Sequence, residues 1–366
     1  MFNNSSIQRN NTDTGLVPEP YVSTVIRLTL YAVVFVLTVL GNILVIMVIM
    51  KNRKLRSIET YYYGYYLLNL AIADLSVAVL VIPFTVVYNE SGDWPFSAFL
   101  CKVIPTILVA ALCASILTLL VLTCERYWSI CYPFKPRLTR NKLFVILGLV
   151  WFFSFAAASP ELFVYELRDN VSGAQIQEKY PCAEQWESNE QRQAYTTFLF
   201  IFSYLLPLVV ILAAYLRIVY ELRTSTTQCF GPNDEDHIKK TVRVLIIVVA
   251  SFALCYLPEK VLFIWIDYGN GGTYPYIDIL MKYSYFFQWF NSCLNPIIYG
   301  AVDINFRNFY SSLLRHCAGF KTYSSEIKRR MSVAKSSKHG NGDFTSDNLP
   351  EEVSEHLVKN GHVSHV

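Results

Sequence analysis

Ionisable and amide side chains inside long apolar stretches are the residues of this sequence most able to do chemistry. Asp74 lies in the middle of the otherwise apolar stretch Leu67–Ile82. Polar side chains in three other apolar stretches are available as its partners: Asn42, Ser115, Asn291 and Asn295. A carboxylate inside a membrane is unfavourable unless it is paired, so its default interpretation is functional. These residues predict a hydrated cluster that binds a small cation; the alternative is plain helix-to-helix hydrogen bonding, worth about 0.6 kcal/mol per contact.

An adjacent acid and base, Glu125 and Arg126, precede Tyr127 at the end of another apolar stretch. Such a pair taken alone is a common feature of helix ends. Prolines lie inside three further apolar stretches, where each frees a backbone carbonyl and weakens the helix: Pro207, Pro258 and Pro296. Several weakened helices in one bundle favour a switch over a rigid anchor.

The elements that hold these residues are predicted to be membrane-spanning helices. Of the 366 residues, 53% are hydrophobic and only 16% are charged, whereas about 25% are charged in soluble domains. The apolar residues gather in stretches of the length, about 20 residues, that crosses a bilayer: Val25–Met50, Tyr62–Val87, Phe99–Ile130, Leu143–Val164, Tyr195–Tyr220, Thr241–Ile266 and Ile277–Val302. The last is the weakest, because Lys282, Asn291 and Asn295 interrupt it. We therefore predict an all-α membrane protein with a seven-transmembrane helix bundle.

Lysine and arginine in the short connections predict the orientation, because they resist translocation. They follow the first and third stretches and flank the connection before the sixth: Lys51, Arg53, Lys54, Arg56, Lys135, Arg137, Arg140, Lys142, Arg223, Lys239, Lys240 and Arg243. The N-terminus is therefore expected outside and the C-terminus in the cytoplasm of a multi-pass plasma-membrane protein. Glycosylation signals fall on the outer side: Asn3, Asn4, Asn10 and Asn170. No cleavable signal peptide is evident.

Nine cysteines are present, without the CxxC spacing of a metal site. Cys101 and Cys182 are the only ones predicted to lie in the oxidising exterior, so we expect a disulfide between them. Cys317 follows a short amphipathic stretch in which apolar residues recur at helical spacing: Phe306, Phe309, Leu313 and Leu314. This pattern predicts a short eighth helix on the inner membrane face with a palmitoylated Cys317; a reduced cytosolic thiol is the alternative.

These observations divide the chain into four segments. Residues 1–23 are expected to form an extracellular glycosylated tail, 24–302 the bundle, 303–317 the amphipathic juxtamembrane helix and 318–366 a disordered cytoplasmic tail. The last segment is polar, as disordered segments are, and is available to regulators such as an arrestin. Its end, Ser364-His365-Val366, fits a PDZ groove, which accepts a free carboxylate beside an apolar side chain. An arbitrary solvated end is the alternative.

The ordered set of these motifs resembles the rhodopsin-like (class A) G-protein-coupled receptors over about Thr24 to Cys317. The matching residues of the first four helices are Gly41-Asn42, Leu70-Ala71-Ile72-Ala73-Asp74, Cys101, Glu125-Arg126-Tyr127 and Trp151. Those of the last three are Pro207, Tyr215, Phe252, Cys255-Tyr256-Leu257-Pro258 and Asn295-Pro296-Ile297-Ile298-Tyr299. Any one motif is weak, but the ordered set is specific.

The resemblance implies that an agonist enters between the outer helix ends, that the sixth helix swings outward below Pro258, and that a cytoplasmic cleft opens for a heterotrimeric G protein. Arg126 would reach into that cleft with Tyr215 and Tyr299 as partners. A packed connector would change rotamers and would contain Ile116, Pro207, Phe252, Tyr256 and Pro258. The residues that match the family's sodium site are Asp74, Ser115, Asn291 and Asn295. An allosteric Na⁺ is therefore the one cofactor expected.

Two positions depart from the family pattern and two others narrow the ligand class. Tyr256 stands where the family usually has Trp, so the resemblance does not carry the toggle role to this position; Ile238 stands where some members place an acid against Arg126, so that inactive-state lock is not expected. Trp289 replaces the lysine that would bind retinal, and Leu108 replaces the aspartate that would bind an amine. Light sensing and small amines are therefore disfavoured.

What remains is similar to the peptide-receptor branch of the neuropeptide FF, orexin and tachykinin type. The matching runs are Trp94-Pro95-Phe96, Pro160-Glu161 and Cys182-Ala183-Glu184-Gln185-Trp186. The connection Glu166–Arg192 is long enough for a hairpin held over the bundle by Cys182. The expected pocket places charges among aromatic residues: Leu108, Glu161, Glu259, Lys260, Phe263, Tyr285 and Trp289. A cationic peptide end, such as Arg before an amidated aromatic residue, would pair with a carboxylate and stack on the rings; an internal Glu–Lys ion pair is the alternative.

Other function classes have less support in the sequence. A class A receptor for a non-peptide ligand is the nearest alternative. A transporter or channel is disfavoured because we find neither an internal repeat nor a second line of acids in the spans. No segment remains for a soluble enzyme domain, and a net charge of +3 is too small to indicate a nucleic-acid partner.

Overall fold

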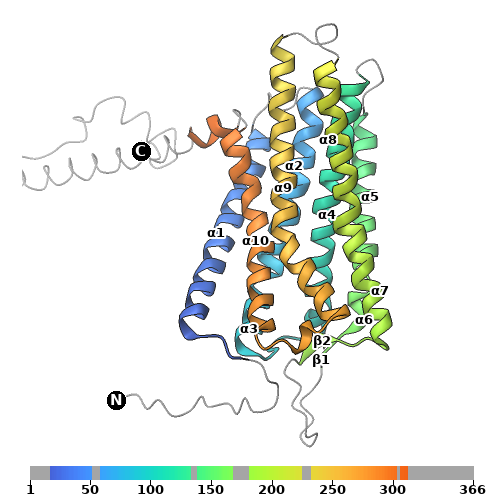
Figure 1. The fold of residues 1–366 in the computed structure, drawn as a ribbon. Helices are drawn as coiled ribbons and strands as arrows, with labels where there is room; N and C mark the ends of the chain where they lie inside the picture. Colours follow the sequence, from blue (N-terminus) through green and yellow to red (C-terminus); the bar gives the residue numbers. More distant parts are fainter. Residues whose placement is uncertain are drawn as a thin grey trace, which may run out of the picture. The chain divides into compact units, whose positions relative to one another are not determined.

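The computed structural model describes residues 17–51, 58–132, 138–167, 181–224, 232–302 and 306–311. The chain divides into the units Met1–Asn308 and Phe309–Val366, and the described part of the first is a bundle of long helices (Figure 1). The expected eighth helix is described only over residues 306–311, which are helical. Several predicted positions lie outside the described residues, namely the glycosylation sites Asn3, Asn4, Asn10 and Asn170, the palmitoylation site Cys317 and the tail 318–366.

Four of the bundle's segments are continuous helices: α1 (Tyr21–Lys51), α4 (Ala98–Cys131), α9 (Pro232–Tyr268) and α10 (Ile277–Val302). Three others are composite: α2 (Ile58–Leu80) with α3 (Ile82–Ser91), α5 (Arg140–Ala158) with α6 (Glu161–Val164), and α7 (Asn189–Phe200) with the π-helical turn η2 (Ile201–Leu205) and α8 (Leu206–Thr224). Proline explains two of the breaks, because Pro83 lies in the first turn of α3 and Pro160 precedes α6.

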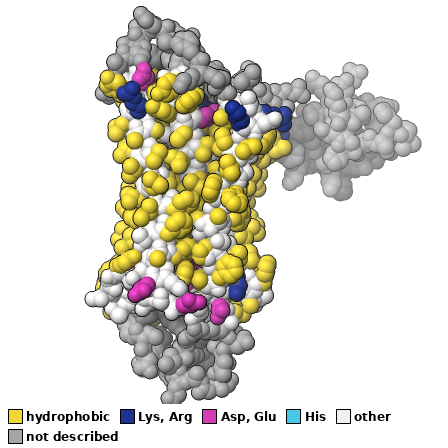
Figure 2. All heavy atoms as spheres, turned by 90° about the vertical axis from the view of Figure 1, so that its right-hand side faces the viewer, with side chains coloured by type: hydrophobic (Ala, Val, Ile, Leu, Met, Phe, Trp, Pro, Cys, Tyr) yellow, Lys and Arg dark blue, Asp and Glu magenta, His cyan; other side chains and the backbone are white. Residues whose placement is uncertain are grey.

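Six helical segments within the described residues are long and apolar enough to cross a membrane. The seventh, α10, is more polar, but it packs against α1 and α9 and completes the predicted seven-helix bundle. Figure 2 shows the consequence on one face, where hydrophobic side chains cover the middle and charged side chains lie at the two ends. Surface of this kind is expected to face lipid.

Two helices begin several residues before the predicted apolar stretches, because their first turns are polar. The fifth helical segment begins at Asn189, whereas the apolar stretch begins at Tyr195. Ser188 caps this helix by accepting a hydrogen bond from the Gln191 N–H, at 3.3 Å. α9 likewise begins at Pro232, before the apolar stretch at Thr241. Hydropathy does not detect such polar turns, although the capping serine does mark one of them.

A two-stranded hairpin closes one end of the bundle. β1 (Tyr165–Leu167) pairs antiparallel with β2 (Cys182–Glu184), with Leu167 opposite Cys182. A disulfide joins Cys182 to Cys101 in the first turn of α4, which confirms both the predicted bond and the predicted hairpin. We call this end of the bundle the disulfide end and the opposite end, near which Arg126 lies on α4, the Arg126 end.

Candidate functional site

The cluster around Asp74 lies in the buried middle of the bundle. Asn295 on α10 donates a hydrogen bond from Nδ2 to Asp74 Oδ2 on α2, at 2.9 Å. Asn42 on α1 donates to the Ser292 carbonyl on α10, at 3.1 Å. α1 can approach α10 closely here because residue 41 is glycine: a Cβ at Gly41 would lie 2.9 Å from Pro296 Cβ.

The other two predicted members of this cluster are also buried. Ser115 on α4 is 5% exposed and Asn291 on α10 is 3% exposed. Asn291 Oδ1 has no hydrogen-bond partner among the described residues. An oxygen that can accept a hydrogen bond or bind a cation is therefore available on α10, the helix that contacts Asp74. Sequence reasoning missed Ser292, whose carbonyl joins α10 to α1. The described residues contain no group of three or more His, Cys, Asp or Glu able to hold a metal ion.

At the Arg126 end, the predicted coupling residues of α4, α8 and α10 lie together with Tyr63 of α2. The Arg126 guanidinium lies over the Tyr63 ring, 5.2 Å from its centroid. Thr123 Oγ1 donates to Tyr215 OH at 3.2 Å, and the Tyr299 ring packs on Phe306 at 5.6 Å. Tyr63 and Thr123 were not predicted. Residues Glu125 and Tyr127 flank Arg126 on α4, and the Ile238 side chain lies outside the described part of the chain.

The predicted connector is packed between α4, α8 and α9. Ile116 and Phe252 are fully or almost fully buried, and Phe252 stacks on Tyr256 with ring centroids 4.3 Å apart. Tyr256, the residue that replaces the family's usual Trp, is therefore buried, two residues before Pro258. Pro207 follows the π-helical turn, whose Tyr204 donates to the Ala253 carbonyl at 2.8 Å. Such π turns are frequent at functional sites, and no residue pattern in the sequence predicts this one.

The predicted pocket residues at the disulfide end are brought together only in part. Glu161, Glu259 and Lys260 are all buried, and Lys260 Nζ lies 3.1 Å from Glu259 Oε2. The internal Glu–Lys ion pair, which was the alternative interpretation of these residues, is therefore formed. Leu108 and Phe263 are half-buried on α4 and α9.

Trp289 lies deeper than a pocket-lining residue would. It is 0% exposed and packs edge-on against Tyr31, with ring centroids 4.8 Å apart. Tyr285 stacks on it from one turn along α10, at 6.1 Å. Trp289 therefore supports the α10 wall, and Tyr285 is the more exposed of the two rings.

Two acids near the hairpin join this site although the sequence reasoning did not place them there. Glu184 accepts hydrogen bonds from Trp186 Nε1 at 2.6 Å and from Tyr165 OH at 3.3 Å. Burial raises the pKa of Glu184, and the charge of Asp267 raises it further. Asp267 at the end of α9 pairs with Arg192 Nε at 3.0 Å. The sequence does contain a signal for Glu184. Residues two apart on a strand point to the same face, so Glu184 is expected to lie on the same side of the hairpin as Cys182.

Comparisons with known proteins agree with this geometry. The profile of the family described as 7 transmembrane receptor (rhodopsin family) matches residues 41–299, a range that contains Asp74, Arg126 and Tyr299. The pyroglutamylated RF-amide peptide receptor of Mus musculus is 30% identical over 346 residues, covering 86% of this chain and 79% of that protein. Neuropeptide FF receptor 1 of Homo sapiens is 31% identical over 301 residues, covering 78% and 69%. Galanin receptor 2a of Danio rerio is 31% identical over 295 residues, covering 80% and 78%. The chain therefore belongs to the rhodopsin family of seven-transmembrane receptors, the class A G-protein-coupled receptors, and is a multi-pass protein of the plasma membrane.

Proposed function

We propose that this receptor binds a cationic peptide at the disulfide end and activates a heterotrimeric G protein at the Arg126 end. The observation that carries the proposal is an excess of acid around the hairpin among the residues that the structure describes. Four acids lie there, Glu161, Glu184, Glu259 and Asp267, and the ion pairs formed between described residues are Glu259 with Lys260 and Asp267 with Arg192. Uncompensated carboxylates in a dry site are unfavourable until a cation enters. The names of the mouse and human relatives, which refer to RF-amide peptides and neuropeptide FF, favour the same ligand class.

The test is a peptide panel applied to cells that express the chain. The panel contains short peptides ending in Arg-Phe-amide, the same peptides with a free carboxylate, and peptides with citrulline in place of Arg. We expect the amidated cationic peptides to bind and to stimulate nucleotide exchange, and we expect a non-hydrolysable GTP analogue to lower their affinity. Activity of small non-peptide ligands alone would contradict the peptide proposal, and transport without nucleotide sensitivity would indicate a carrier.

We also propose that the N-terminus lies outside and the C-terminus in the cytoplasm. Lys and Arg of the connections at the Arg126 end support this orientation, since they resist translocation, and a disulfide is stable on the oxidising side. Glycosylation of the N-terminal tail, palmitoylation of Cys317, and recruitment of an arrestin and of a PDZ-domain protein by the C-terminal tail are further proposals that follow from the sequence.

The pKa of Glu184 predicts how peptide affinity depends on pH. A carboxyl with a raised pKa takes up a proton at a higher pH than an exposed carboxyl does, so Glu184 is expected to lose its charge before the exposed acids do as the pH falls. We expect the affinity for a cationic peptide to fall roughly tenfold from neutral to mildly acidic pH, the scale of one charge-assisted hydrogen bond of about 1.5 kcal/mol. Radioligand binding at several pH values measures this.

The matched variants separate Glu184 from other acids. Glu184→Gln is expected to bind weakly at neutral pH and to show a flatter pH profile. Glu190→Gln removes an exposed acid from the first turn of α7 and is expected to keep the wild-type profile. A pH profile of Glu184→Gln that matches the wild type would argue against the role of Glu184.

We propose that the Asp74 cluster binds Na⁺ and favours the inactive packing. Na⁺ binds oxygen ligands, and the cluster offers three: the Asp74 carboxylate, the Ser115 hydroxyl and Asn291 Oδ1. Among the described residues Asn291 Oδ1 has no hydrogen-bond partner. Sodium, compared with a bulky organic cation at equal ionic strength, is expected to lower agonist affinity several-fold in the wild type. Asp74→Asn should remove that difference. No sodium effect on the wild type would leave the cluster as structural hydrogen bonding.

A further inference from the structure

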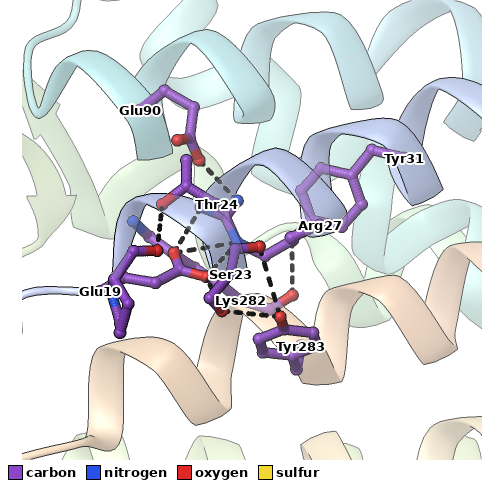
Figure 3. A network of polar contacts seen from close by, with 9 residues as sticks. Glu19, Ser23, Thr24, Arg27, Tyr31, Glu90, Lys282 and Tyr283 are labelled. Carbon is purple, nitrogen blue, oxygen red and sulfur yellow. Dashed lines mark hydrogen bonds and ion pairs between the residues drawn. The ribbon is translucent and has the colours of Figure 1, made fainter.

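Arg27 is a fully buried arginine near the start of α1, and its side chain is 0% exposed. Its Nε and Nη2 atoms donate to the Glu19 carboxylate, with a shortest distance of 2.6 Å. Its Nη1 atom donates to Glu90 Oε1 at 2.5 Å. Figure 3 shows the two acids approaching Arg27 from different elements, Glu19 from the segment before α1 and Glu90 from α3. We call these three residues the Arg27 clamp.

The clamp differs from an exposed ion pair in its burial and its geometry. The Glu19 side chain is only 6% exposed and the Glu90 side chain 24% exposed. Burial acts to raise the pKa of Glu19, but hydrogen bonds from Arg27 and Ser23 outweigh it and hold that pKa below its usual value. The planar guanidinium meets one carboxylate with two nitrogen atoms and the other with a third, an arrangement that a lysine cannot reproduce.

Further contacts join the clamp to α10 and to the chain before it. The Ser23 hydroxyl lies 2.8 Å from Tyr283 OH, and Tyr31 OH donates to the Lys282 carbonyl at 2.5 Å. The Val17 N–H donates to the Pro275 carbonyl at 2.8 Å. The segment Val17–Pro20 is therefore held at Val17 by the chain that leads into α10 and at Glu19 by Arg27.

The α10 wall of the bundle depends on the same contacts. Tyr31, one turn along α1 from Arg27, packs on Trp289, and Trp289 carries the stacked ring of Tyr285. We propose that Arg27 is a positioning residue that docks the segment Val17–Pro20 on the bundle and fixes the register of α1 against α10, and so the placement of Tyr285 and Trp289. This role is independent of which ligand the receptor binds.

Hydrogen–deuterium exchange of the full-length receptor in lipid nanodiscs, without ligand, tests the proposal. The readouts are peptides that cover Val17–Thr24 and the first turns of α10, Ile277–Tyr285. We expect Arg27→Gln to speed exchange in both regions at least tenfold, because the docking contacts and the α1–α10 contact are lost together. Arg140→Gln, which removes an exposed arginine at the Arg126 end, should leave both regions unchanged.

Two further variants keep the test decisive if Arg27→Gln folds poorly with its two acids unpaired. The charge-free variant Glu19→Gln/Arg27→Met/Glu90→Gln keeps about the same buried volume and removes all three charges of the clamp together, so that no clamp residue is left as an unpaired ion; it should reach the cell surface and show the same faster exchange. Glu19→Gln should speed exchange in Val17–Thr24 more than in α10. Wild-type exchange in the charge-free variant would overturn the proposal, and acceleration confined to Val17–Thr24 in every variant would overturn the coupling to α10.

Discussion

Arg126→Ala is expected to abolish agonist-stimulated nucleotide exchange while peptide affinity and surface expression stay within about twofold of the wild type. The Arg126 side chain is half-buried at the Arg126 end and lies on the ring of Tyr63. Its Nε atom has no hydrogen-bond partner in the described part of the chain. The substitution therefore removes little packing, but it removes the cation that the family mechanism places against the G protein.

The control for this result is an exposed arginine at the same end of the bundle. Arg140→Ala changes the charge by the same amount on α5, and it should retain most of the signal. GTP-analogue binding to membranes with matched receptor numbers measures both variants. Wild-type exchange in Arg126→Ala would contradict the assignment of Arg126 to G-protein coupling.

The present contacts of the tyrosines around Arg126 indicate what has to change on activation. Tyr215 OH accepts a hydrogen bond from Thr123, and Tyr299 packs on Phe306. In the family mechanism, both tyrosines instead become contact partners of Arg126. Activation in this chain is therefore expected to exchange the Thr123 and Phe306 contacts for contacts with Arg126, a rearrangement that the π-helical turn and Pro258 make easier.

Much of the fold follows from the sequence because lipid-facing helices need long apolar stretches. The third and seventh predicted stretches agree with α4 and α10 within one residue at each end. The π-helical turn at Ile201–Leu205 could not be predicted, since its residues are ordinary apolar helix residues and its geometry depends on Tyr204 reaching α9. Tertiary contact, not local propensity, determines such a turn.

The sequence singles out site residues where a motif contains them, but not where charges distant in the chain meet. The predicted Cys101–Cys182 bond is confirmed, whereas the sodium-binding role of Asp74 and the coupling role of Arg126 stay predictions. Arg27 lies inside the first predicted stretch, but a single charge barely changes the average of such a window. Its partner Glu90 is 63 residues away, and nothing in either local sequence links the two.

The charges of the disulfide end divide into two groups with different consequences. On the α1, α3 and α10 side, Glu19 and Glu90 share Arg27 as their ion-pair partner, and Lys282 supplies a second positive charge that acts on Glu19. On the α6, β2 and α9 side, the described residues include more acids than bases, since four carboxylates lie there with Lys260 and Arg192. A cationic ligand group is therefore attracted to the second side, since the acids of the first already have a buried counter-charge.

Glu161→Gln is expected to lower the affinity for an amidated peptide ending in Arg-Phe-amide by roughly a hundredfold, or about 3 kcal/mol. Glu161 is 5% exposed on α6, directly before the hairpin strand that leads to Leu167. Among the described residues Lys260 is paired with Glu259 and Glu161 forms no ion pair, so a peptide cation would give Glu161 a counter-charge. The amide of glutamine has nearly the same shape, and the loss therefore reports charge and not volume.

A double-mutant cycle with the peptide separates a direct contact from a structural effect. The citrulline peptide keeps the shape of arginine without its charge, and it should bind the wild type and Glu161→Gln with nearly equal, weak affinity. Glu190→Gln removes an exposed acid of α7 and should change neither affinity by more than about twofold. If Glu161→Gln weakened the Arg and citrulline peptides to the same degree, Glu161 would support the pocket without contacting the peptide cation. Glu184, the other acid of this side that forms no ion pair among the described residues, would then be left to receive it.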